Sequence, residues 1–434
     1  MKKATAWGVI FLLIFISSCK KNKDTSVAPL IISLSTPGTG ATYLMYDTVI
    51  VTGRITDGIV PNALTVGLYD IQGALVQSNM PIVINGTNFN FTAKYFLSDL
   101  HLASGQYNIR VTATDQYLSA WSESLVNIVA APTIKTGYYI CGASQTNIVT
   151  QYDVNFNSVS VIPLNTGFNG MAFGSYYQQL YLNGNHNQSV ESVSPQTSGI
   201  LWSFPYIGGG LPEFTFIGTD NMYPYIGYYT GNVVSYNSSG GIQTTYINHN
   251  NALYPRYFTV TSTYGAGIFS NHFAGPDELI TYGKLTGVPV NSLIPPCTVS
   301  YIFEHTADEL YLFGNDAQGN ATLYLYSVTG NVLNSSAFSL GSGKLFAAAQ
   351  VDSDHFILSI GGSIYLYQYS TANLTLLLNM PAQKLLYNPA RSELDLSSKN
   401  TFNAYSLTGL NTLVLTNSKV FTDSILDFEV ITNK

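Results

Sequence analysis

From residue 138 to the C-terminus, apolar and polar residues alternate in short runs that are separated by polar turns. The clearest example is ELYLFGNDAQGNATLYLYSVTGN at 309–331, which predicts a strand, a turn, a second strand ending in YSVTG at 326–330, and a third strand. Similar endings recur at Tyr236, Tyr369 and Tyr405, and weaker ones at Tyr152, Val193 and Tyr282.

These anchors follow one another at intervals of 36 to 46 residues. Such a period, filled with strands, is typical of a β-propeller, in which each blade has four antiparallel strands and the innermost one lines a central channel. Residues 133–434, at about 43 residues per blade, predict seven blades. The candidate innermost strands are 171–173, 214–217, 257–260, 299–303, 345–349 and 385–387.

The first blade has no innermost strand of its own, because only two strands precede its anchor at Tyr152. We expect residues 425–431, at the C-terminus, to supply this strand and to pair beside the strand that contains Tyr139 and Cys141. The pairing would close the ring and remove free strand edges.

A second pattern of short strands lies between residues 30 and 131, with turn signals at Pro37-Gly38, Asp57-Gly58 and Asn85-Gly86. Seven strands in about 100 residues predict a β-sandwich that resembles Ig-like domains, and Tyr107 in GQYNIRV resembles their tyrosine corner. We expect this domain to act as a spacer. The predicted strands are 30–34, 48–55, 64–69, 74–77, 88–95, 105–114 and 122–129.

The fold class is therefore predicted to be all-β, with an Ig-like sandwich at 30–131 followed by a seven-bladed propeller at 133–434. The composition agrees, because Tyr (32) and Phe (22) are abundant and charged residues make up only 9% of the chain. The segment Gln196 to Trp202 resembles the tGxxlW ending of quinoprotein-type propeller repeats. This resemblance supports the fold and implies no quinone cofactor.

The N-terminus reads as a leader, with a basic start at Lys2 and Lys3 and an apolar run at 7–16 that is too short to span a bilayer. The following Ile16-Ser17-Ser18-Cys19 resembles the lipobox of bacterial lipoproteins, and the Lys-rich tail resembles that of Bacteroidetes-type outer-membrane lipoproteins. The resemblance implies a signal peptide at 1–18, lipidation of Cys19, a tether at 19–29 and attachment to the outer membrane, on its periplasmic or cell-surface face. The alternative is a plain signal peptide with an incidental cysteine.

No catalytic signature stands out in the sequence, which lacks HExxH, P-loop, GxSxG and CxxC motifs. Cys141 and Cys297 fall in blades that are not neighbours, so we interpret them as buried hydrophobic residues without a disulfide. The sequence 315–319 and the pair Asp352 and Asp354 fit turns better than calcium loops. We predict no metal ion and no cofactor, and the formal net charge of −7 argues against nucleic acid as a partner.

One set of positions points to a ligand. The residues directly before the innermost strands recur at the blade period, so we expect them to form a ring at one channel mouth, where propellers hold ligands. We expect Arg256 to grip the ligand and Tyr257 to stack on it, while Lys344 and Lys384 would favour an anionic sugar. The alternative is a set of loop positions that face water. The ring is Asn169, Glu213, Arg256, Thr298, Lys344, Lys384 and Ser424, with Tyr257 and Asp423 beside it.

These patterns favour a monomeric, non-catalytic binding lipoprotein of the cell envelope, with a glycan or an envelope protein as its ligand. Two alternatives remain open at this point. One is a polysaccharide hydrolase or lyase, for which Glu213 and Asp423 are the only candidate carboxylate pair. The other is a structural scaffold of an envelope complex.

The lipobox generates a direct prediction. Cys19→Ala removes the thiol that would carry the acyl chains, so the variant should move from the membrane fraction to the soluble fraction. Fractionation of expressing cells, with and without detergent, measures this. A variant that still needs detergent for release would contradict lipidation at Cys19.

Overall fold

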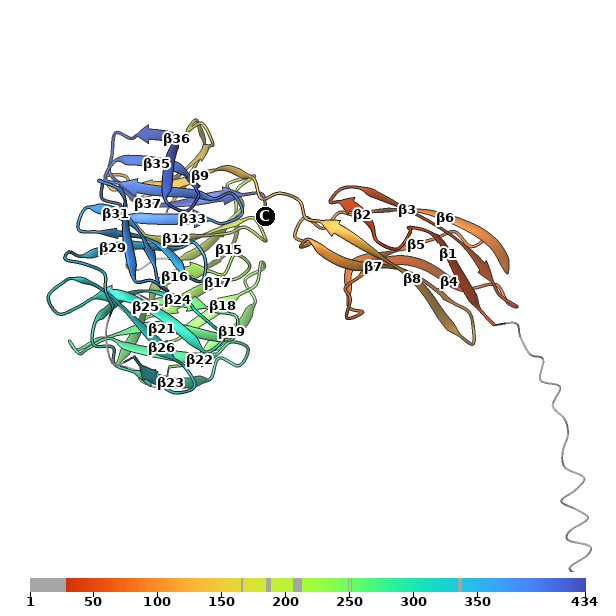
Figure 1. The fold of residues 1–434 in the computed structure, drawn as a ribbon, viewed down its shortest axis with the longest axis horizontal. Coiled ribbons are helices and arrows are strands. Elements are labelled where there is room, and N and C mark those ends of the chain that lie inside the picture. Colours follow the sequence, from red (N-terminus) through yellow and green to blue (C-terminus); the bar gives the residue numbers. More distant parts are fainter. Residues whose placement is uncertain are drawn as a thin grey trace, which may run out of the picture. The chain divides into compact units, whose positions relative to one another are not determined.

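The computed structural model describes residues 29–434, apart from 165–166, 185–188, 206–212, 249, 251 and 335–337. The predicted signal peptide and Cys19 lie outside the described residues. All regular secondary structure in the described part is β-strand, as predicted, and runs from β1 to β37 (Figure 1). No helix of this part is long and apolar enough to cross a membrane. The chain divides into two compact units, 1–131 (unit 1) and 132–434 (unit 2).

Unit 1 contains two sheets, with strand orders β1-β3-β6 and β2-β8-β7-β4-β5. Each of the seven predicted strands is present. The short strand β2 was not predicted, because its four residues show too little alternation, and it pairs in parallel with β8. The strands are β1 (Ile31–Thr36), β2 (Ala41–Leu44), β3 (Thr48–Thr56), β4 (Ala63–Tyr69), β5 (Leu75–Pro81), β6 (Asn88–Phe96), β7 (Gly105–Thr114) and β8 (Ser119–Val129).

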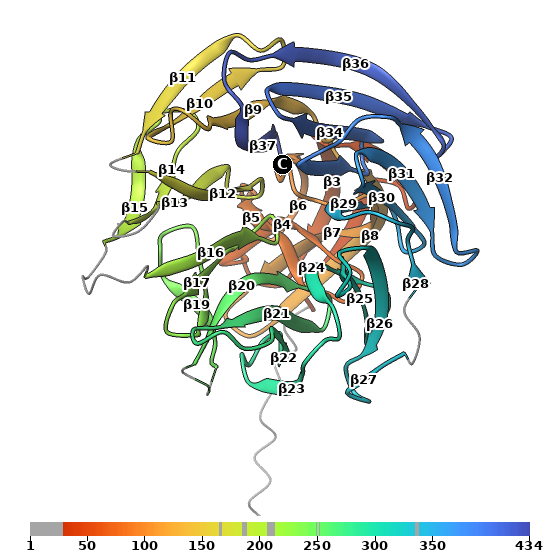
Figure 2. The same cartoon turned by 90° about the vertical axis from the view of Figure 1, so that its left-hand side faces the viewer.

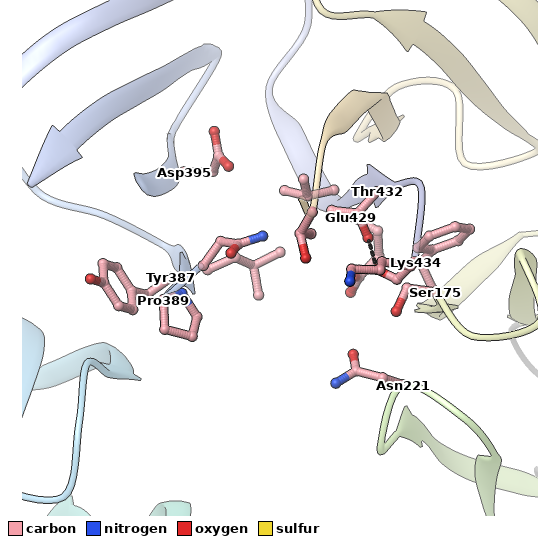
Figure 3. A pocket seen from close by; sticks show the side chains of 13 residues that line it. Ser175, Asn221, Tyr387, Pro389, Asp395, Glu429, Thr432 and Lys434 are labelled. Atoms are coloured by element: carbon pink, nitrogen blue, oxygen red, sulfur yellow. Dashed lines mark hydrogen bonds between the residues drawn. The ribbon is translucent and has the colours of Figure 1, made fainter. Parts of the chain in front are cut away.

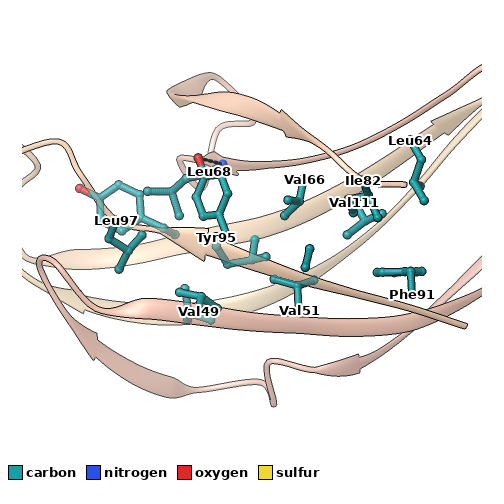
Figure 4. Close-up of a cluster of buried hydrophobic side chains, with 14 of the residues drawn as sticks. Val49, Val51, Leu64, Val66, Leu68, Ile82, Phe91, Tyr95, Leu97 and Val111 are labelled. Atoms are coloured by element: carbon teal, nitrogen blue, oxygen red, sulfur yellow. Dashed lines mark hydrogen bonds between the residues drawn. The ribbon is translucent and has the colours of Figure 1, made fainter. Parts of the chain in front are cut away.

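The core of unit 1 lies between these sheets, because alternate residues of strands such as β3, β6 and β7 point inward (Figure 4). Val49 and Val51 of β3 are fully buried in this way. Tyr95 is tolerated in the core because its hydroxyl accepts a hydrogen bond from the Leu68 amide at 3.2 Å and reaches the carbonyl oxygen of Gln77 at 3.1 Å. The Tyr107 hydroxyl donates to the Ala103 carbonyl oxygen at 3.0 Å, the backward contact that a tyrosine corner makes.

The described residues of unit 2 form seven antiparallel sheets. Figure 2 shows them arranged around a common centre, with β12, β16, β20, β24 and β37 nearest to it. The first three sheets in chain order consist of β9 (Lys135–Gly142), β10 (Ile148–Asp153), β11 (Ser158–Pro163) and β37 (Ile425–Thr432); β12 (Phe168–Gly174), β13 (Gln179–Gly184), β14 (Val190–Val193) and β15 (Ile200–Phe204); and β16 (Phe214–Thr219), β17 (Pro224–Tyr228), β18 (Val233–Tyr236) and β19 (Ile242–Tyr246).

The remaining four sheets follow the same order along the chain. They consist of β20 (Leu253–Val260), β21 (Tyr264–Asn271), β22 (Glu278–Gly283) and β23 (Pro289–Leu293); β24 (Thr298–Glu304), β25 (Glu309–Asn315), β26 (Ala321–Ser327), β27 (Val332–Leu333) and β28 (Phe338–Ser339); β29 (Leu345–Gln350), β30 (His355–Ile360), β31 (Ser363–Gln368) and β32 (Asn373–Leu378); and β33 (Lys384–Asn388), β34 (Glu393–Ser398), β35 (Thr401–Thr408) and β36 (Thr412–Val420).

The C-terminal strand β37 pairs antiparallel with β9, the first strand of unit 2. The register places Glu429 opposite Tyr139 and Asp427 opposite Cys141, which confirms the predicted pairing. Phe428, between these two carboxylates, points to the other face and is fully buried, with its ring centroid 4.9 Å from that of Phe402. The last strand of the chain therefore completes both the hydrogen bonding and the apolar core of the first sheet of unit 2.

Cys141 and Cys297 are both buried and unbonded, as predicted. Burial raises the pKa of each thiol to about 12. Both side chains therefore stay protonated at neutral pH and serve as small apolar residues of the core.

The packing of Phe428 generates a prediction for stability. Phe428→Ala removes a fully buried ring and should lower the free energy of unfolding by about 3–5 kcal/mol. Leu415→Ala in β36 is the control, because Leu415 is exposed and its loss should change stability by less than about 0.5 kcal/mol. Denaturant titration followed by tyrosine fluorescence measures both. Equal midpoints for the two variants would contradict the role of β37.

Candidate functional site

Three of the cavities in the described part of unit 2 adjoin along its centre. We name them the central cavity, of about 550 Å³, the side cavity, of about 570 Å³, and the exit cavity, of about 330 Å³. Lys384 and Asp427 line both the central and the side cavity, while Glu429 and Asn221 line both the central and the exit cavity. The space is therefore large enough for a small ligand or for part of a longer one.

The innermost, or central, strand of each of the seven sheets lines the central or the side cavity, and most of these strands share a local irregularity near their first residues. Six of the seven central strands carry a bulge there, in which one extra residue stands between two paired neighbours. A bulge bends the strand and re-aims the side chain that it carries. The strand β33 starts without one, at Lys384. The bulge residues are Asn169, Thr215, Arg256, Ser300, Phe346 and Leu426.

The central cavity brings together part of the predicted ring. Its lining includes Asn169, Arg256, Tyr257 and Lys384. Asn169 and Arg256 are bulge residues, and Lys384 is the first residue of the strand without a bulge. Burial raises the pKa of Tyr257 to about 12, so its hydroxyl stays protonated and can donate a hydrogen bond.

Glu213, Lys344 and Asp423 do not line any of the three cavities. Glu213 and Lys344 stand two residues before the bulges of their strands. These two predicted ring positions therefore lie about 7 Å along the strand from the bulge positions. The carboxylate of Asp423 accepts hydrogen bonds from the Ser144 amide and hydroxyl, at 2.6 and 2.7 Å. The predicted carboxylate pair, Glu213 and Asp423, therefore does not lie in the lining of the central, side or exit cavity.

Lys384 lies between two carboxylates at the junction of the cavities. Its Nζ is 2.7 Å from Asp427 Oδ1 and 2.7 Å from Glu429 Oε1. Burial alone would lower the pKa of Lys384, but the attraction of the two carboxylates outweighs it and raises this pKa above its ordinary value. Burial raises the pKa of Glu429, and Lys384 opposes that shift. The cluster therefore carries a net formal charge of one negative unit.

This cluster corrects one interpretation made from the sequence. Lys384 does not offer a free positive charge to an anionic sugar, because its charge is already compensated by Asp427 and Glu429. The sequence did not show this, since the two acids follow Lys384 by more than forty positions and reach it only through the pairing of β37 with β9.

Arg256 is also held by neighbouring groups. Its Nη2 donates to Asp277 Oδ2 at 2.7 Å and to the Val299 carbonyl oxygen at 2.9 Å, and Ser270 Oγ donates to the other Asp277 oxygen at 2.7 Å. Its side chain remains 41% exposed. The guanidinium is therefore ordered at the cavity wall, and its charge is balanced by Asp277.

Asn183 of β13 is the most unusual residue of the central cavity. It is 99% buried, and neither its amide nitrogen nor its amide oxygen has a hydrogen-bond partner in the described part of the chain. Leaving such a group buried and unpaired costs about 1–3 kcal/mol, so a water molecule or a ligand in the cavity would stabilise it. Sequence reasoning missed Asn183, because an Asn-Gly pair reads as a turn signal and only the fold places it at a cavity wall.

The exit cavity is bordered by a buried ion cluster. Asp395, Glu429, Thr432 and Lys434 surround the cavity (Figure 3). Both oxygens of Asp395 accept hydrogen bonds from Lys135 Nζ, at 3.0 and 3.3 Å.

Lys135 also contacts Glu393, whose second oxygen is 2.8 Å from Arg391 Nε. Two positive and two negative charges therefore balance, as buried charges must, and Asp395 is occupied by a structural partner. Within the described residues, no group of three or more His, Cys, Asp or Glu side chains is placed to hold a metal ion.

No family model and no curated protein matches the chain. Among solved structures it is similar to a quinonprotein alcohol dehydrogenase-like protein from Bacteroides thetaiotaomicron, with 11% identity, a TM-score of 0.46, and coverage of 92% of this chain and 97% of that one. It is also similar to the WD40 beta propeller domain of Doa1, with 7% identity, a TM-score of 0.47, and coverage of 61% of this chain and 88% of that one. A third similar structure is BamB from Moraxella catarrhalis, with 10% identity, a TM-score of 0.42, and coverage of 68% of this chain and 91% of that one.

Asp395 gives stability a pH dependence of definite sign. Burial raises its pKa in the folded protein from 3.8 to about 6, so the folded state keeps a proton that the unfolded state releases. Its stabilising contribution is fully present below the unfolded pKa and is lost as the pH rises through about 6, by on the order of 3 kcal/mol. Denaturant titrations between about pH 4 and pH 7 measure this fall.

Asp395→Asn should weaken this fall, because the amide does not titrate. Asp153→Asn is the control, since Asp153 is only partly buried and hydrogen bonds from Asn157 lower its pKa instead of raising it. The Asp153 variant should keep the full decrease of stability from acid to neutral pH. Identical pH profiles for the parent protein and Asp395→Asn would contradict the raised pKa.

Proposed function

We propose that this protein is a non-catalytic binding module of the bacterial cell envelope that takes a saccharide into the central cavity of unit 2. The observation that carries the proposal is the buried amide of Asn183, which has no partner in the described part of the chain and lines that cavity. Saccharide hydroxyls both donate and accept hydrogen bonds, so they satisfy a carboxamide in both directions.

The chemistry of the cavity wall favours a neutral saccharide over a charged one. Arg256 is balanced by Asp277, and the cluster around Lys384 is one unit negative, which opposes an anionic ligand. Amides and hydroxyls, which suit sugar hydroxyls, and an aromatic ring at Tyr257, on which a sugar ring can stack, complete the wall. The neutral polar groups are Asn169, Asn183, Thr215 and Thr259.

The proposal includes the finer architecture. We infer that the seven sheets of unit 2 are the blades of a seven-bladed propeller whose ring is closed by β37, a view supported by the contacts of β37 with β9, β12 and β33. We infer that unit 1 is an Ig-like spacer, which its two sheets and the Tyr107 contact support. Lipidation of Cys19, attachment to the outer membrane and a monomeric state belong to the same proposal.

The test starts from a glycan array probed with the purified protein without its leader, followed by calorimetry with the best ligand. Asn183→Leu replaces the amide by an apolar group of similar shape. It should leave stability unchanged or raise it, because an unpaired buried amide is removed, and should weaken binding at least tenfold. Opposite effects of this kind on stability and affinity would indicate that the Asn183 amide contributes to ligand binding and not to folding.

Asn403→Leu is the matched control. Asn403 is also a buried strand asparagine, but its amide oxygen accepts a hydrogen bond from Ser418 Oγ at 2.7 Å, and it does not line the central cavity. This variant should lose stability and keep the parent affinity. An Asn183→Leu variant that binds the ligand as tightly as the parent would refute the site. Release of shorter products from a bound polysaccharide would overturn the non-catalytic function, and absence of any glycan binding would favour a scaffold.

A further inference from the structure

The outer surface of the five-stranded sheet of unit 1 carries an ordered aromatic array. Arg110 of β7 lies between Tyr69 of β4 and Trp121 of β8, with its guanidinium carbon 4.2 Å from the first ring centroid and 5.8 Å from the second. These three residues alternate with the buried residues of their strands and so point away from the core. We call Tyr69, Asn79, Arg110, Trp121 and Glu123 the aromatic face.

Each polar member of the aromatic face is fixed by a neighbour. Arg110 Nε donates to Glu123 Oε2 at 2.8 Å, and the Tyr69 hydroxyl donates to Asn79 Oδ1 at 3.3 Å. Gly67 leaves the space that Asn79 occupies, because a Cβ at Gly67 would clash with Asn79 Oδ1. The face is therefore ordered before any ligand binds, which reduces the entropy lost on binding.

The face also presents apolar surface to the solvent. Trp121 is 63% exposed, although a tryptophan that packs in a core or interface buries about 150–250 Å². In the loop between β7 and β8, Tyr117 is 70% exposed as well. An ordered tryptophan that is left open in this way is a candidate binding residue.

We propose that the aromatic face is a second saccharide-binding site, specific for a neutral, extended glycan chain and independent of the central cavity. Charge favours this occupant, because the only ions of the face, Arg110 and Glu123, neutralise each other and give no attraction to an ionic partner. A sugar ring stacks its C–H face on Trp121, and hydroxyls bond to Asn79 and Glu123.

The geometry of the sheet suits a chain of several sugars. Trp121 and Tyr69 lie on strands separated by β7, and the Arg110 guanidinium carbon is 5.8 Å and 4.2 Å from their ring centroids, so the two rings are at most about 10 Å apart. Hydrogen-bonding groups alternate with the rings along this row.

The experiment uses the full chain without its leader and with Trp202→Phe. The sequence has three tryptophans, one of them Trp7 of the predicted leader, so Trp121 becomes the only tryptophan that remains. The probes are soluble cello-, xylo- and manno-oligosaccharides. At least one of these neutral probes should cause a saturable change of Trp121 fluorescence, and the sulfated or uronic oligosaccharides used for comparison should cause none.

Variants then separate the aromatic face from the central cavity. In calorimetry with the same probe, Trp121→Ala should reduce affinity by about tenfold or more. Tyr46→Ala is the matched control, because Tyr46 is also an exposed aromatic residue of unit 1, stacked on Phe96 and outside the aromatic face. It should keep the parent affinity. Asn183→Leu, which tests the central cavity, should leave the Trp121 signal unchanged.

Three results would overturn the proposal of a saccharide site, and a fourth would overturn its independence from the central cavity. The first is that none of the neutral oligosaccharides changes the fluorescence of Trp121. The second is that Trp121→Ala binds the probe as tightly as the parent, which would move the site elsewhere. The third is that Trp121→Ala loses a defined protein partner while no saccharide binds, which would make the face a protein-docking surface. The fourth result concerns Asn183→Leu. If this variant loses both saccharide binding in the central cavity and the change of Trp121 fluorescence, the two sites are not independent.

Discussion

The pairing of β37 with β9 is the interaction on which the rest of unit 2 depends. It joins the last strand of the chain to the first strand of the unit, and the alternation of β37 then divides its side chains between two tasks. Phe428 enters the apolar core, while Asp427 and Glu429 on the opposite face reach Lys384 at the central cavity. The same strand therefore supplies core packing, sheet hydrogen bonds and the charges of the candidate site.

Charged residues are few in this chain, yet several of them lie near the centre of unit 2. Lys384 and Lys135 each contact two carboxylates, which compensates for the removal of the charges from water. The result is a polar interior with almost no net charge, and its free hydrogen-bonding capacity lies in neutral groups such as Asn183. This balance bears on the class of ligand that the cavity suits, because the cluster around Lys384 keeps one negative charge, which opposes an anion, while the charge of Arg256 is balanced by Asp277.

The fold could be predicted in large part from the sequence, because period and alternation are local properties of a strand. The repeat placed the central strands, and the missing innermost strand pointed to residues 425–431. The candidate site could be predicted only in part. The sequence does not reveal where a bulge adds a residue, so the predicted ring positions coincide with the bulge at Arg256 but precede it by two residues at Glu213 and Lys344. The roles of Asn183 and of the partners of Lys384 depend on contacts between distant segments, which no local pattern records.

The long separation between β9 and β37 has a consequence for the order of folding events. Tyr139 and Glu429, paired in the sheet, are 290 positions apart along the chain. The entropy of closing so long a loop rises only slowly with length, by about 0.6 kcal/mol per doubling, so the separation does little to the final stability. Its effect is on time, because a ribosome adding roughly 5–20 residues per second leaves β9 without its partner for on the order of tens of seconds. The first sheet of unit 2 to be synthesised is therefore the last to be completed, and its open edge must be shielded from other chains until the final residues emerge.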